Sequence, residues 1–551
     1  MTFTLQPRWL VALLALSSMS PHTAAFQSDL QQQPFRISST TQPLGPTTYG
    51  KAQRVAVIGA GAAGSSTAYH LQQYAANATI PLDITIFEAS SRVGGRTTTV
   101  NALDDPRYPA ELGASIFVSV NHILVDAAEE FDLEALEAGA ARPSESKYEI
   151  GIWDGKEFVY KSMNDDLGFL NLVKLFWRYG LAPLKTQRLM KSTVAKFLKM
   201  YDEPEFPWKS LTDMVSRVGL LDTTASTGWQ FLKSNGVGEK FGNEIIQAST
   251  RVNYGQNLGL IHGLETMVCM ATDGAMAVEG GNWRIFDGMV KKSRAHLRLN
   301  TSVEEITRLE EGGYQLSLSK KERHGVRTQT EDRFDSIVLA APFQYTGIKV
   351  SPALPHQPDE IPYVTLYVTL LVSPHRLSPK FFSTPTSPLA DQDFDSIPEI
   401  VITTLPAGLD LGSSPEGVGP TKFWSVSTLR SIPVNGSAQY LYKIFSPQPM
   451  NATFLSRLLD FSVEAKEDGN DSVDNVDKRH ISWSYEKKWH SYPYEYPRVT
   501  FEDLNLDAKG LWYTSGIESF ISTMETSALM GKNVAKLIVN ELVEKSGSDL
   551  N

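Results

Sequence analysis

Cysteine, basic charge and long hydrophobic runs are all scarce in this sequence of 551 residues. The single cysteine, Cys269, excludes a disulfide within the chain and is expected to act as a small buried hydrophobic residue. Lysine and arginine number 51 against 62 acidic residues, and the resulting net charge of −11 argues against nucleic acid as a partner. The ten histidines and the cysteine lack zinc-site spacing, so no metal is expected.

The hydrophobic run at the N-terminus is short. Arg8 precedes the apolar residues 9–16, and Thr23-Ala24-Ala25 has the small residues of a cleavage site. Such a run is too short to cross a bilayer, so residues 1–25 are predicted to be a secretory signal peptide and residues 26–53 a flexible lead-in. A lysosomal, vacuolar or secreted glycoprotein is therefore expected. Five Asn-x-Ser/Thr sequons fit that expectation: Asn77, Asn300, Asn435, Asn451 and Asn470.

The most informative segment is Arg54 to Leu71, in which an apolar run leads into a glycine-rich turn and then a helix-forming stretch. This order of strand, turn and helix is typical of a dinucleotide-binding βαβ unit. Gly59 permits a tight turn, Gly61 lets a pyrophosphate approach the backbone, and Gly64 lets the helix pack closely on the strand. Together with Ala63, these glycines are expected to bind the cofactor phosphates at the helix N-terminus.

The residues after the second predicted strand, Leu82 to Phe87, favour FAD as the cofactor. Glu88 ends that strand and is placed to bind the ribose hydroxyls of the adenosine. Two glycines and two arginines follow directly, as in flavoproteins where backbone and guanidinium groups complete the pyrophosphate site. These four predicted cofactor-binding residues are Arg92, Gly94, Gly95 and Arg96.

Segments far along the chain are expected to complete the FAD site. Gly113 lies in a stretch similar to the one that passes near the isoalloxazine of such flavoproteins, and Val303 resembles the residue that binds adenine through its backbone. The C-terminal strand from Leu511 ends at Gly516, and Glu518 is placed to bind the ribitol. The helix predicted over residues 524–539 brings Thr526 near its start, toward the phosphates or the flavin pyrimidine.

Length and a hydrophobic content of 42% predict two interleaved domains of the α/β class. Residues 54–121, 265–343 and 484–544 are assigned to a Rossmann-type FAD-binding domain like those of glutathione reductase and the amine oxidases. Residues 122–264 and 344–483 are assigned to an α+β substrate domain, with helices first and strands at 364–372, 400–405 and 440–445. In the cofactor domain, one strand is expected over 297–306 and a hairpin over 314–318 and 334–341.

One stretch of the substrate domain, Leu167 to Tyr201, alternates apolar and basic residues with helical spacing. Such a pattern suits the mouth of a lipid-binding site or peripheral contact with a membrane surface. An amphipathic helix pair packed on the sheet, with its basic side in solvent, explains the same pattern. The sequence leaves both readings open.

The motifs together resemble the prenylcysteine oxidase family, also called prenylcysteine lyases. The specific likeness lies in the segment Arg251 to Asn257, which reads RVNYGQN, and in Ala277 to Asn282, which reads AVEGGN. The aromatic and proline-containing segment Trp489 to Pro497 adds to it, and the resemblance spans about residues 54–542. The loop over residues 464–479 looks like an insertion relative to the family.

The resemblance implies an FAD-dependent thioether oxidase that acts on a small prenylated substrate. Such an enzyme oxidises the carbon between sulfur and the prenyl chain, with O2 as acceptor, and releases cysteine, a prenyl aldehyde and hydrogen peroxide. Tyr254, Gln256 and Glu279 are then candidates for orienting groups near the flavin, and His490 for assisting water addition. Each has a structural alternative: satisfying buried backbone for the first two, pairing with arginine or helix capping for Glu279, and simple surface exposure for His490.

Three rival functions stay open at this point. A relative of these enzymes acting on the prenyl chain of a terpenoid or meroterpenoid would carry the same flavin motifs. A prenyl-binding chaperone related to the Rab escort proteins would hold lipid without redox chemistry, although the complete glycine motif favours a retained cofactor. An amine or amino-acid oxidase would share both flavin-binding ends of the chain without the RVNYGQN and AVEGGN segments. No obligate protein partner is inferred.

Overall fold

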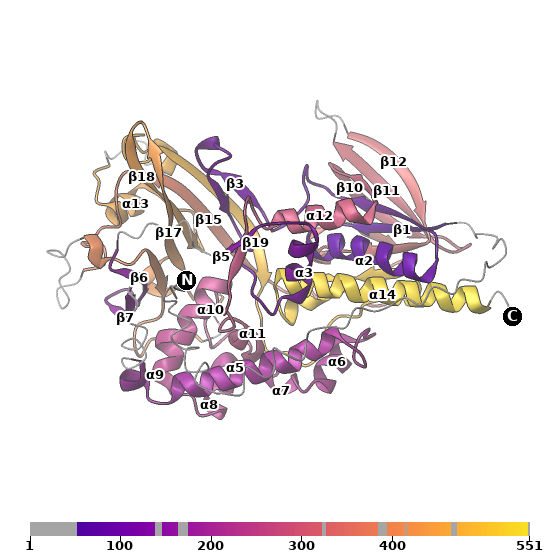
Figure 1. Cartoon of the computed structure of the whole chain (residues 1–551), viewed down its shortest axis with the longest axis horizontal. Helices are drawn as coiled ribbons and strands as arrows, with labels where there is room; N and C mark the ends of the chain where they lie inside the picture. Colours follow the sequence, from indigo (N-terminus) through magenta and orange to yellow (C-terminus); the bar gives the residue numbers. More distant parts are fainter. Residues whose placement is uncertain are drawn as a thin grey trace, which may run out of the picture.

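A parallel sheet of five strands, ordered β20-β13-β1-β2-β9, forms the centre of one half of the molecule (Figure 1). The computed structural model describes residues 52–137, 146–163, 175–321, 327–383, 394–412, 414–415, 417–463 and 471–548. The central strand β1 is buried over residues 55–58, as expected for a parallel sheet covered on both faces. Its strands are β1 (Gln53–Ile58), β2 (Leu82–Phe87), β9 (His296–Arg298), β13 (Ser336–Leu339) and β20 (Leu511–Tyr513).

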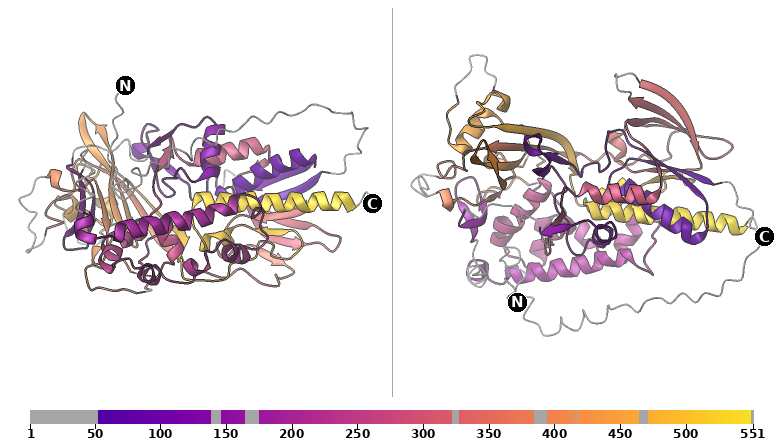
Figure 2. Two further views of the ribbon diagram at one scale, coloured as in Figure 1. Left: turned by 60° about the horizontal axis from the view of Figure 1, so that its bottom comes forward. Right: turned by 45° about the horizontal axis from the view of Figure 1, so that its top comes forward.

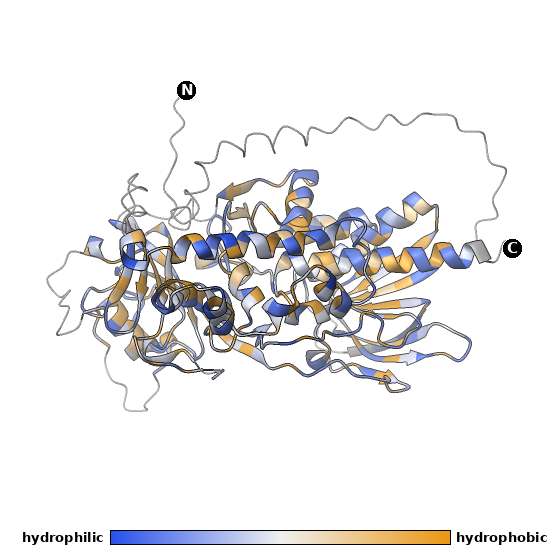
Figure 3. Ribbon diagram, turned by 90° about the horizontal axis from the view of Figure 1, so that it is seen from below, coloured by the Kyte–Doolittle hydropathy of each residue, from blue (hydrophilic) through white to orange (hydrophobic). Residues whose placement is uncertain are grey.

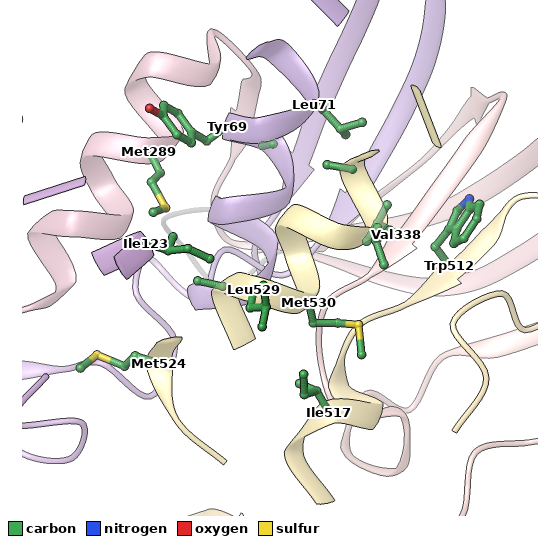
Figure 4. Packing of buried hydrophobic residues seen from close by; sticks show 14 of the residues in the cluster. Tyr69, Leu71, Ile123, Met289, Val338, Trp512, Ile517, Met524, Leu529 and Met530 are labelled. Atoms are coloured by element: carbon green, nitrogen blue, oxygen red, sulfur yellow. The ribbon is translucent and has the colours of Figure 1, made fainter. Parts of the chain in front are cut away.

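Helices from both ends of the chain cover one face of this sheet. The C-terminal helix α14 (Met524–Ser548) packs along α2 (Ala62–Ala78), and α12 (Trp283–Ser293) packs on α2 from the other side. Figure 4 shows the buried apolar side chains where these helices meet α3 (His122–Glu130). Because Tyr69 and Leu529 lie in one core, the two ends of the chain fold as one unit.

A second, four-stranded sheet of order β12-β11-β10-β14 covers the other face. Residues of both sheets, such as Ile58 of β1 and Ile306 of β10, share one buried apolar cluster. The cofactor domain is therefore a layer of helices, a parallel sheet and a mostly antiparallel sheet. The strands of the second sheet are β10 (Thr301–Arg308), β11 (Tyr314–Lys321), β12 (Arg327–Phe334) and β14 (Lys349–Ser351).

Two strand predictions in this region are wrong in detail. The single strand expected over residues 297–306 is divided at Asn300, whose φ of 53° turns the chain from β9 in the first sheet to β10 in the second. The hairpin partner of β11 is β12, whereas the run after Phe334 forms β13 and pairs with β1. Alternation of apolar residues predicts a strand but does not specify its partner.

A seven-stranded mixed sheet of order β19-β15-β18-β17-β16-β6-β7 forms the other half of the molecule. The three strands expected at 364–372, 400–405 and 440–445 are confirmed as β15, β16 and β18. The strands are β6 (Tyr148–Trp153), β7 (Phe158–Met163), β15 (Tyr363–Ser373), β16 (Ile400–Thr403), β17 (Ser425–Val434), β18 (Ser437–Ser446) and β19 (Trp483–Pro493).

The helices of residues 182–268 gather on one side of this sheet (Figures 1 and 2). Along this side, seen from below in Figure 3, hydrophilic and hydrophobic residues alternate on the helices, as amphipathic packing requires. The helices are α5 (Ala182–Leu198), α6 (Leu211–Arg217), α7 (Leu221–Thr224), α8 (Gly228–Ser234), α9 (Glu239–Phe241), α10 (Gln247–Tyr254) and α11 (Gly263–Val268); α13 (Ala452–Leu459) lies elsewhere on the sheet.

The boundaries between the two domains differ from the expected ones at four elements. Helix α3 packs with α14 and α12, and β14 pairs with β10, so both lie with the cofactor domain. Helix α11 packs on α5 and α8, and β19 pairs with β15, so both lie with the substrate domain. Two short antiparallel strand pairs stand apart from the three larger sheets. They are β3 (Thr99–Asn101) with β4 (Pro109–Glu111) and β5 (Ala135–Glu137) with β8 (Met276–Val278).

The expected signal peptide and most of the lead-in lie outside the described residues, as do Asn470 and the start of the Leu167–Tyr201 stretch. Among the helices that the structure describes, none combines the length and the apolar composition needed to span a bilayer. Cys269 is buried, as the sequence predicts for a small hydrophobic residue.

Candidate cofactor and active site

The three glycines after β1 form the turn that the sequence predicts. Gly59 has a φ of +107°, and a Cβ atom there would lie 2.7 Å from the Ala340 carbonyl oxygen. A Cβ atom at Gly64 would overlap the Gly59 carbonyl oxygen, so Gly64 is required for close contact between helix and turn. At Gly61, by contrast, an added Cβ would meet only the Cα atom of Gly95, at 3.9 Å. Gly61 is therefore the least crowded of the three glycines.

The start of α2 has the features of a phosphate-binding helix N-terminus. Gly61 is its N-cap, and no side chain caps the first amide groups. Acidic residues are absent from this first turn, which contains Ala62, Ala63 and Gly64. Uncapped amides and the positive end of the helix dipole favour an anionic group at this point.

Glu88 lies directly beside the glycine turn. Its Oε2 accepts a hydrogen bond from the Ala60 amide at 2.9 Å, and its Oε1 accepts one from the Ser90 amide at 2.8 Å. The carboxylate is half-buried, and each of its oxygens has a second lone pair. Glu88 is thus held in place by the turn with acceptor capacity left for a ribose hydroxyl.

The loop over residues 92–96 folds back onto the glycine turn. A Cβ atom at Gly95 would lie 3.1 Å from the Gly61 Cα atom, so the two backbones approach closely. The Arg92 guanidinium donates to the Gly95 carbonyl at 2.8 Å and also to the Thr98 hydroxyl. Arg92 therefore shapes this loop, while Gly94, with a φ of +114°, allows its tight turn.

Arg96 joins segments from both ends of the chain. Its Nη2 forms an ion pair with Glu518 Oε1 at 2.6 Å, and its Nη1 donates to the Ser491 carbonyl at 2.7 Å. The Tyr363 hydroxyl donates to the other Glu518 oxygen at 3.0 Å. Glu518 is buried and already bound by two protein donors, whereas the Arg96 side chain keeps 37% of its surface exposed. The cation, rather than the carboxylate, is available to a ligand here.

Two further predicted contacts lie on the walls of this region. Gly113 packs against the indole of Trp489, since a Cβ atom there would lie 3.1 Å from Trp489 Cζ2. Val303 is buried on β10, in the sheet that covers the second face of the parallel sheet. Lys443 on β18, which the sequence analysis missed, donates to the Glu111 carbonyl at 3.1 Å and to the Ser115 hydroxyl at 2.9 Å. The one feature of the sequence that could have indicated a role for Lys443 is the presence of a lysine within a strand rich in aromatic residues.

The C-terminal segment connects Glu518 to the start of α14. Gly516 lies in the 3-10 segment η9 (Ser515–Ser519) and packs on the Glu502 side chain. Thr526 and Thr523 form a reciprocal cap: the Thr526 amide donates to Thr523 Oγ1 and the Thr523 amide to Thr526 Oγ1, each at 3.1 Å. The Thr526 hydroxyl thus fixes the helix start rather than pointing freely toward a ligand.

Tyr254 and Gln256 are buried beside this C-terminal segment. The Tyr254 hydroxyl donates to the Ser522 carbonyl at 3.2 Å. The Gln256 amide donates to the Pro493 carbonyl at 3.0 Å and accepts from the Glu495 amide at 2.9 Å. Both polar ends of Gln256 therefore bind backbone, which is the structural alternative considered for it above.

Glu279 and His490 are both exposed. Near Glu279, Arg284 binds the backbone carbonyl of residue 279, at 2.7 Å, and not its carboxylate. The His490 ring stacks on Tyr345 at 4.6 Å between centroids, on the strand that also carries Trp489 and contacts Arg96. The structure brings His490 close to the cofactor region and leaves the Glu279 carboxylate at the surface.

Arg251 and Asn282 are two further buried polar residues of the family-like segments. The Arg251 guanidinium lies over Trp424 and donates to Asn257 Oδ1 at 2.8 Å and to the Val418 carbonyl at 2.7 Å. Asn282 accepts from the Val278 amide and donates to the Ala114 carbonyl, each at 2.8 Å. Sequence reasoning weighed neither residue, because a polar side chain within a helix or at its start gives no local signal of its burial.

The residues present fit FAD. The uncrowded Gly61, the uncapped start of α2 and the partly exposed Arg96 suit a pyrophosphate, and Glu88 beside them suits a ribose. In the described part of the chain, no group of three or more His, Cys, Asp or Glu side chains is arranged to hold a metal ion.

Comparison with known proteins agrees with this arrangement. Residues 57–131 match the NAD(P)-binding Rossmann-like domain family. A putrescine oxidase bound to putrescine shares the fold with a TM-score of 0.54, 14% identity and coverage of 89% of this chain and 99% of that one. A cyclohexylamine oxidase from Brevibacterium oxydans gives a TM-score of 0.51, 16% identity and coverage of 89% and 100%. These structures confirm the predicted Rossmann-type, amine-oxidase-like fold.

The matches in sequence are more specific. Farnesylcysteine lyase of Arabidopsis thaliana is 30% identical over 506 residues, which are 89% of this chain and 89% of the relative. Human prenylcysteine oxidase 1 is 26% identical over 514 residues, 90% of each chain. Residues 162–549, well over half of the sequence, match the prenylcysteine lyase family. The chain therefore belongs to the prenylcysteine lyase family.

Proposed function

We propose that this protein is an FAD-dependent oxidase that cleaves the thioether of farnesyl- or geranylgeranyl-cysteine. Membership of the prenylcysteine lyase family supports the substrate, and the open glycine turn beside Glu88 and Arg96 supports the cofactor. With O2 as acceptor, one thioether, one O2 and one water give one cysteine, one prenyl aldehyde and one hydrogen peroxide. The observation that carries the proposal is the coincidence of the family match with a turn that leaves Gly61 open.

The chemistry requires little acid or base strength from the protein. Bound FAD supplies a two-electron acceptor, and the substrate carbon that loses electrons is stabilised by its own double bond and sulfur. The chain's part is to orient this carbon and to exclude water until the electrons have left. The buried Tyr254 and the partly buried Tyr492, with ring centroids 5.0 Å apart, form an aromatic wall next to the C-terminal segment.

We infer that His490 moves a proton in the later steps. Its exposed imidazole stacks on Tyr345, and the carbonyl of the next residue, Ser491, accepts a hydrogen bond from Arg96. Water addition to the oxidised carbon and release of the cysteine sulfur each require a proton transfer, which an imidazole performs near neutral pH.

Incubation of the purified protein with farnesylcysteine in air tests the proposal. We expect a yellow protein that consumes O2 and forms cysteine, farnesal and peroxide in equal amounts. Geranylgeranylcysteine, prenylated terpenoids and primary amines complete the panel. Peroxide formed with a terpenoid or an amine but with neither prenyl thioether contradicts the proposal, and a colourless protein that binds the thioether unchanged favours a chaperone.

Contact with a membrane surface is part of the same proposal. Phe176, Trp177 and Leu181 expose 57%, 89% and 56% of their surfaces just before and at the start of α5, next to exposed Lys185 and Arg188. Apolar side chains flanked by basic ones suit anionic lipid, from which a prenyl substrate would be taken. Sedimentation with phosphatidylserine vesicles tests this, with W177A expected to lower binding and phosphatidylcholine vesicles as control; equal binding by W177A contradicts it.

We further propose that the protein passes through the secretory pathway to a lysosome, vacuole or the exterior as an N-glycoprotein. Asn77 is exposed in the last turn of α2, and Asn435 is exposed in the turn between β17 and β18. Asn451 is exposed as well, although its side chain accepts from the Phe454 amide as the cap of α13. Endoglycosidase treatment should lower the apparent mass of the protein from its native host; an unchanged mass contradicts glycosylation.

A further inference from the structure

A buried polar cluster that the proposed reaction does not use lies next to the C-terminal segment that runs from Glu518 to the start of α14. It comprises His262, Glu265 and Glu495, and all three residues are 0% exposed. His262 is the N-cap of α11, Glu265 lies in the first turn of the same helix, and Glu495 follows β19. Burial of two charged carboxyl groups costs free energy unless they are protonated or paired with a cation. We therefore examined what these two groups could do.

The imidazole of His262 lies between the two carboxyl-bearing residues. Its Nδ1 accepts a hydrogen bond from the Glu265 amide at 3.0 Å, so its proton resides on Nε2. Nε2 lies 3.5 Å from Glu495 Oε2, and the His262 amide donates to the Glu495 carbonyl at 2.7 Å. Burial lowers the pKa of His262 to about 3, so the ring is neutral and brings no positive charge.

Among the residues that the structure describes, no hydrogen bond of normal geometry reaches either carboxyl group, although the Tyr254 hydroxyl and the Ser522 amide lie near Glu265 and partly offset the rise of its pKa. The titratable and charged groups facing Glu265 are Tyr254, Cys269 and Glu495, and those facing Glu495 include Arg498 and Glu518. Burial raises the pKa of Glu265 to about 8. Burial and the adjacent Glu265 raise the pKa of Glu495 as well, because two like charges cannot both form cheaply at this site.

The cluster is joined to the segment that carries the predicted flavin contacts. Tyr254, whose ring lies beside Glu265, donates its hydroxyl to the Ser522 carbonyl at 3.2 Å. Ser522 lies between Glu518, which binds Arg96, and Thr523, which caps α14. A charge that forms on the cofactor at this segment is therefore felt by Glu265 and Glu495 through an interior of low dielectric constant.

We propose that Glu265 and Glu495 are positioning residues of the flavin site that together store one exchangeable proton, which they bind when the cofactor gains negative charge. The inference rests on the proposed FAD-dependent function. In the balanced step, FAD takes up two electrons and one proton, and the carboxyl pair takes up one further proton from solvent. The two-electron donor is the thioether in the proposed reaction and dithionite in the test.

The reduction potential of the bound flavin between pH 6.5 and 9.5 tests this. Each proton taken up with two electrons shifts the potential by about 30 mV per pH unit, since a tenfold change in an equilibrium constant corresponds to about 30 mV for such a couple. At the acidic end of this range the pair already holds its proton in both redox states, and the expected slope is about 30 mV per pH unit. At the alkaline end the pair has lost this proton in the oxidised protein and gains it on reduction, and the expected slope is about 60 mV per pH unit.

The double variant E265Q/E495Q should lose the steeper region and keep a slope of about 30 mV throughout. E265Q alone provides the same comparison if the double variant does not fold. The matched control is E399Q, at a buried glutamate that directly precedes β16 in the seven-stranded sheet, which should behave as the wild type. A wild-type slope that does not change, or a change that persists in the double variant, overturns the inference. A protein that binds flavin but leaves farnesylcysteine intact contradicts the proposed function only, because dithionite reduction needs no thioether.

Discussion

The short motifs of the two domains differ in what surrounds them. In the cofactor domain, Gly61 has an uncrowded Cβ side and the neighbouring Arg96 keeps 37% of its side chain exposed. In the substrate domain, Arg251 and Gln256 of the RVNYGQN segment are at most 1% exposed, and their hydrogen bonds connect them to other segments of the same chain. A recurring motif therefore indicates a ligand in one domain and a structural anchor in the other.

The chemical reason for the difference lies in the groups used. A phosphate is bound best by backbone amides and by an exposed cation, which require that side chains be absent from the turn. A loop in the interior must instead satisfy its own carbonyl groups, and a buried arginine or glutamine provides several donors at one point. Asn282 has this second role at the boundary of the two domains.

The largest effect is expected within the glycine turn itself. G64A places a methyl group onto the Gly59 carbonyl oxygen and should destabilise the protein by about 3 kcal/mol or more. G61A, whose φ of −79° suits alanine, should leave the apoprotein within about 1 kcal/mol of the wild type and weaken FAD binding at least tenfold. Thermal unfolding of the apoprotein and flavin titration separate the two effects. Equal flavin affinity in G61A and the wild type would contradict the proposed phosphate site.

Replacement of Arg251 tests the anchoring role in the substrate domain. R251M removes the buried guanidinium that donates to the Val418 carbonyl, to the Asn257 amide oxygen and, beside the Asn257 amide, to the Gly417 carbonyl, so we expect a loss of about 3 kcal/mol. The exposed Arg457 on α13 provides the control, and R457M should change stability by less than about 0.5 kcal/mol. Urea unfolding measures both. Similar stabilities of the two variants contradict the anchor.

A smaller loss is expected at Gln256. Q256L removes one hydrogen bond to the Pro493 carbonyl and one from the Glu495 amide, which should cost about 2 kcal/mol. Flavin content at a temperature well below unfolding should not change, because Gln256 binds backbone alone. A variant of unchanged stability that turns over substrate a hundredfold more slowly would instead assign Gln256 to the chemistry.

The smallest effect is expected at Glu279. Its carboxylate is exposed and no described residue pairs with it, so E279Q should change stability by less than about 0.5 kcal/mol and turnover by less than about threefold. H490A is the informative companion, since loss of a proton-transferring imidazole should lower turnover about a hundredfold without lowering the melting temperature. Steady-state peroxide formation compares the two. The reverse order of effects would restore Glu279 and exclude His490.

Much of the cofactor domain could be predicted because its signals are local. The strand from Leu82 to Phe87 and the helix that begins at Met524 are found where the sequence indicates them. The turn at Asn300 was missed because one left-handed residue within an alternating run changes the sheet to which the chain belongs. The roles of Tyr363 and Lys443 were missed because their contacts are to segments more than a hundred residues away.

The sequence by itself determined the cofactor class and the family, and it predicted that both ends of the chain contribute to the FAD site. Glycine spacing and the acid after the second strand are local requirements of a dinucleotide, so they are visible without a structure. Only the tertiary structure decided which polar residues are buried and what they bind. It assigned Gln256 to the backbone, left Glu279 in solvent and enclosed Glu265 beside Glu495, because burial depends on contacts between segments that no local pattern encodes.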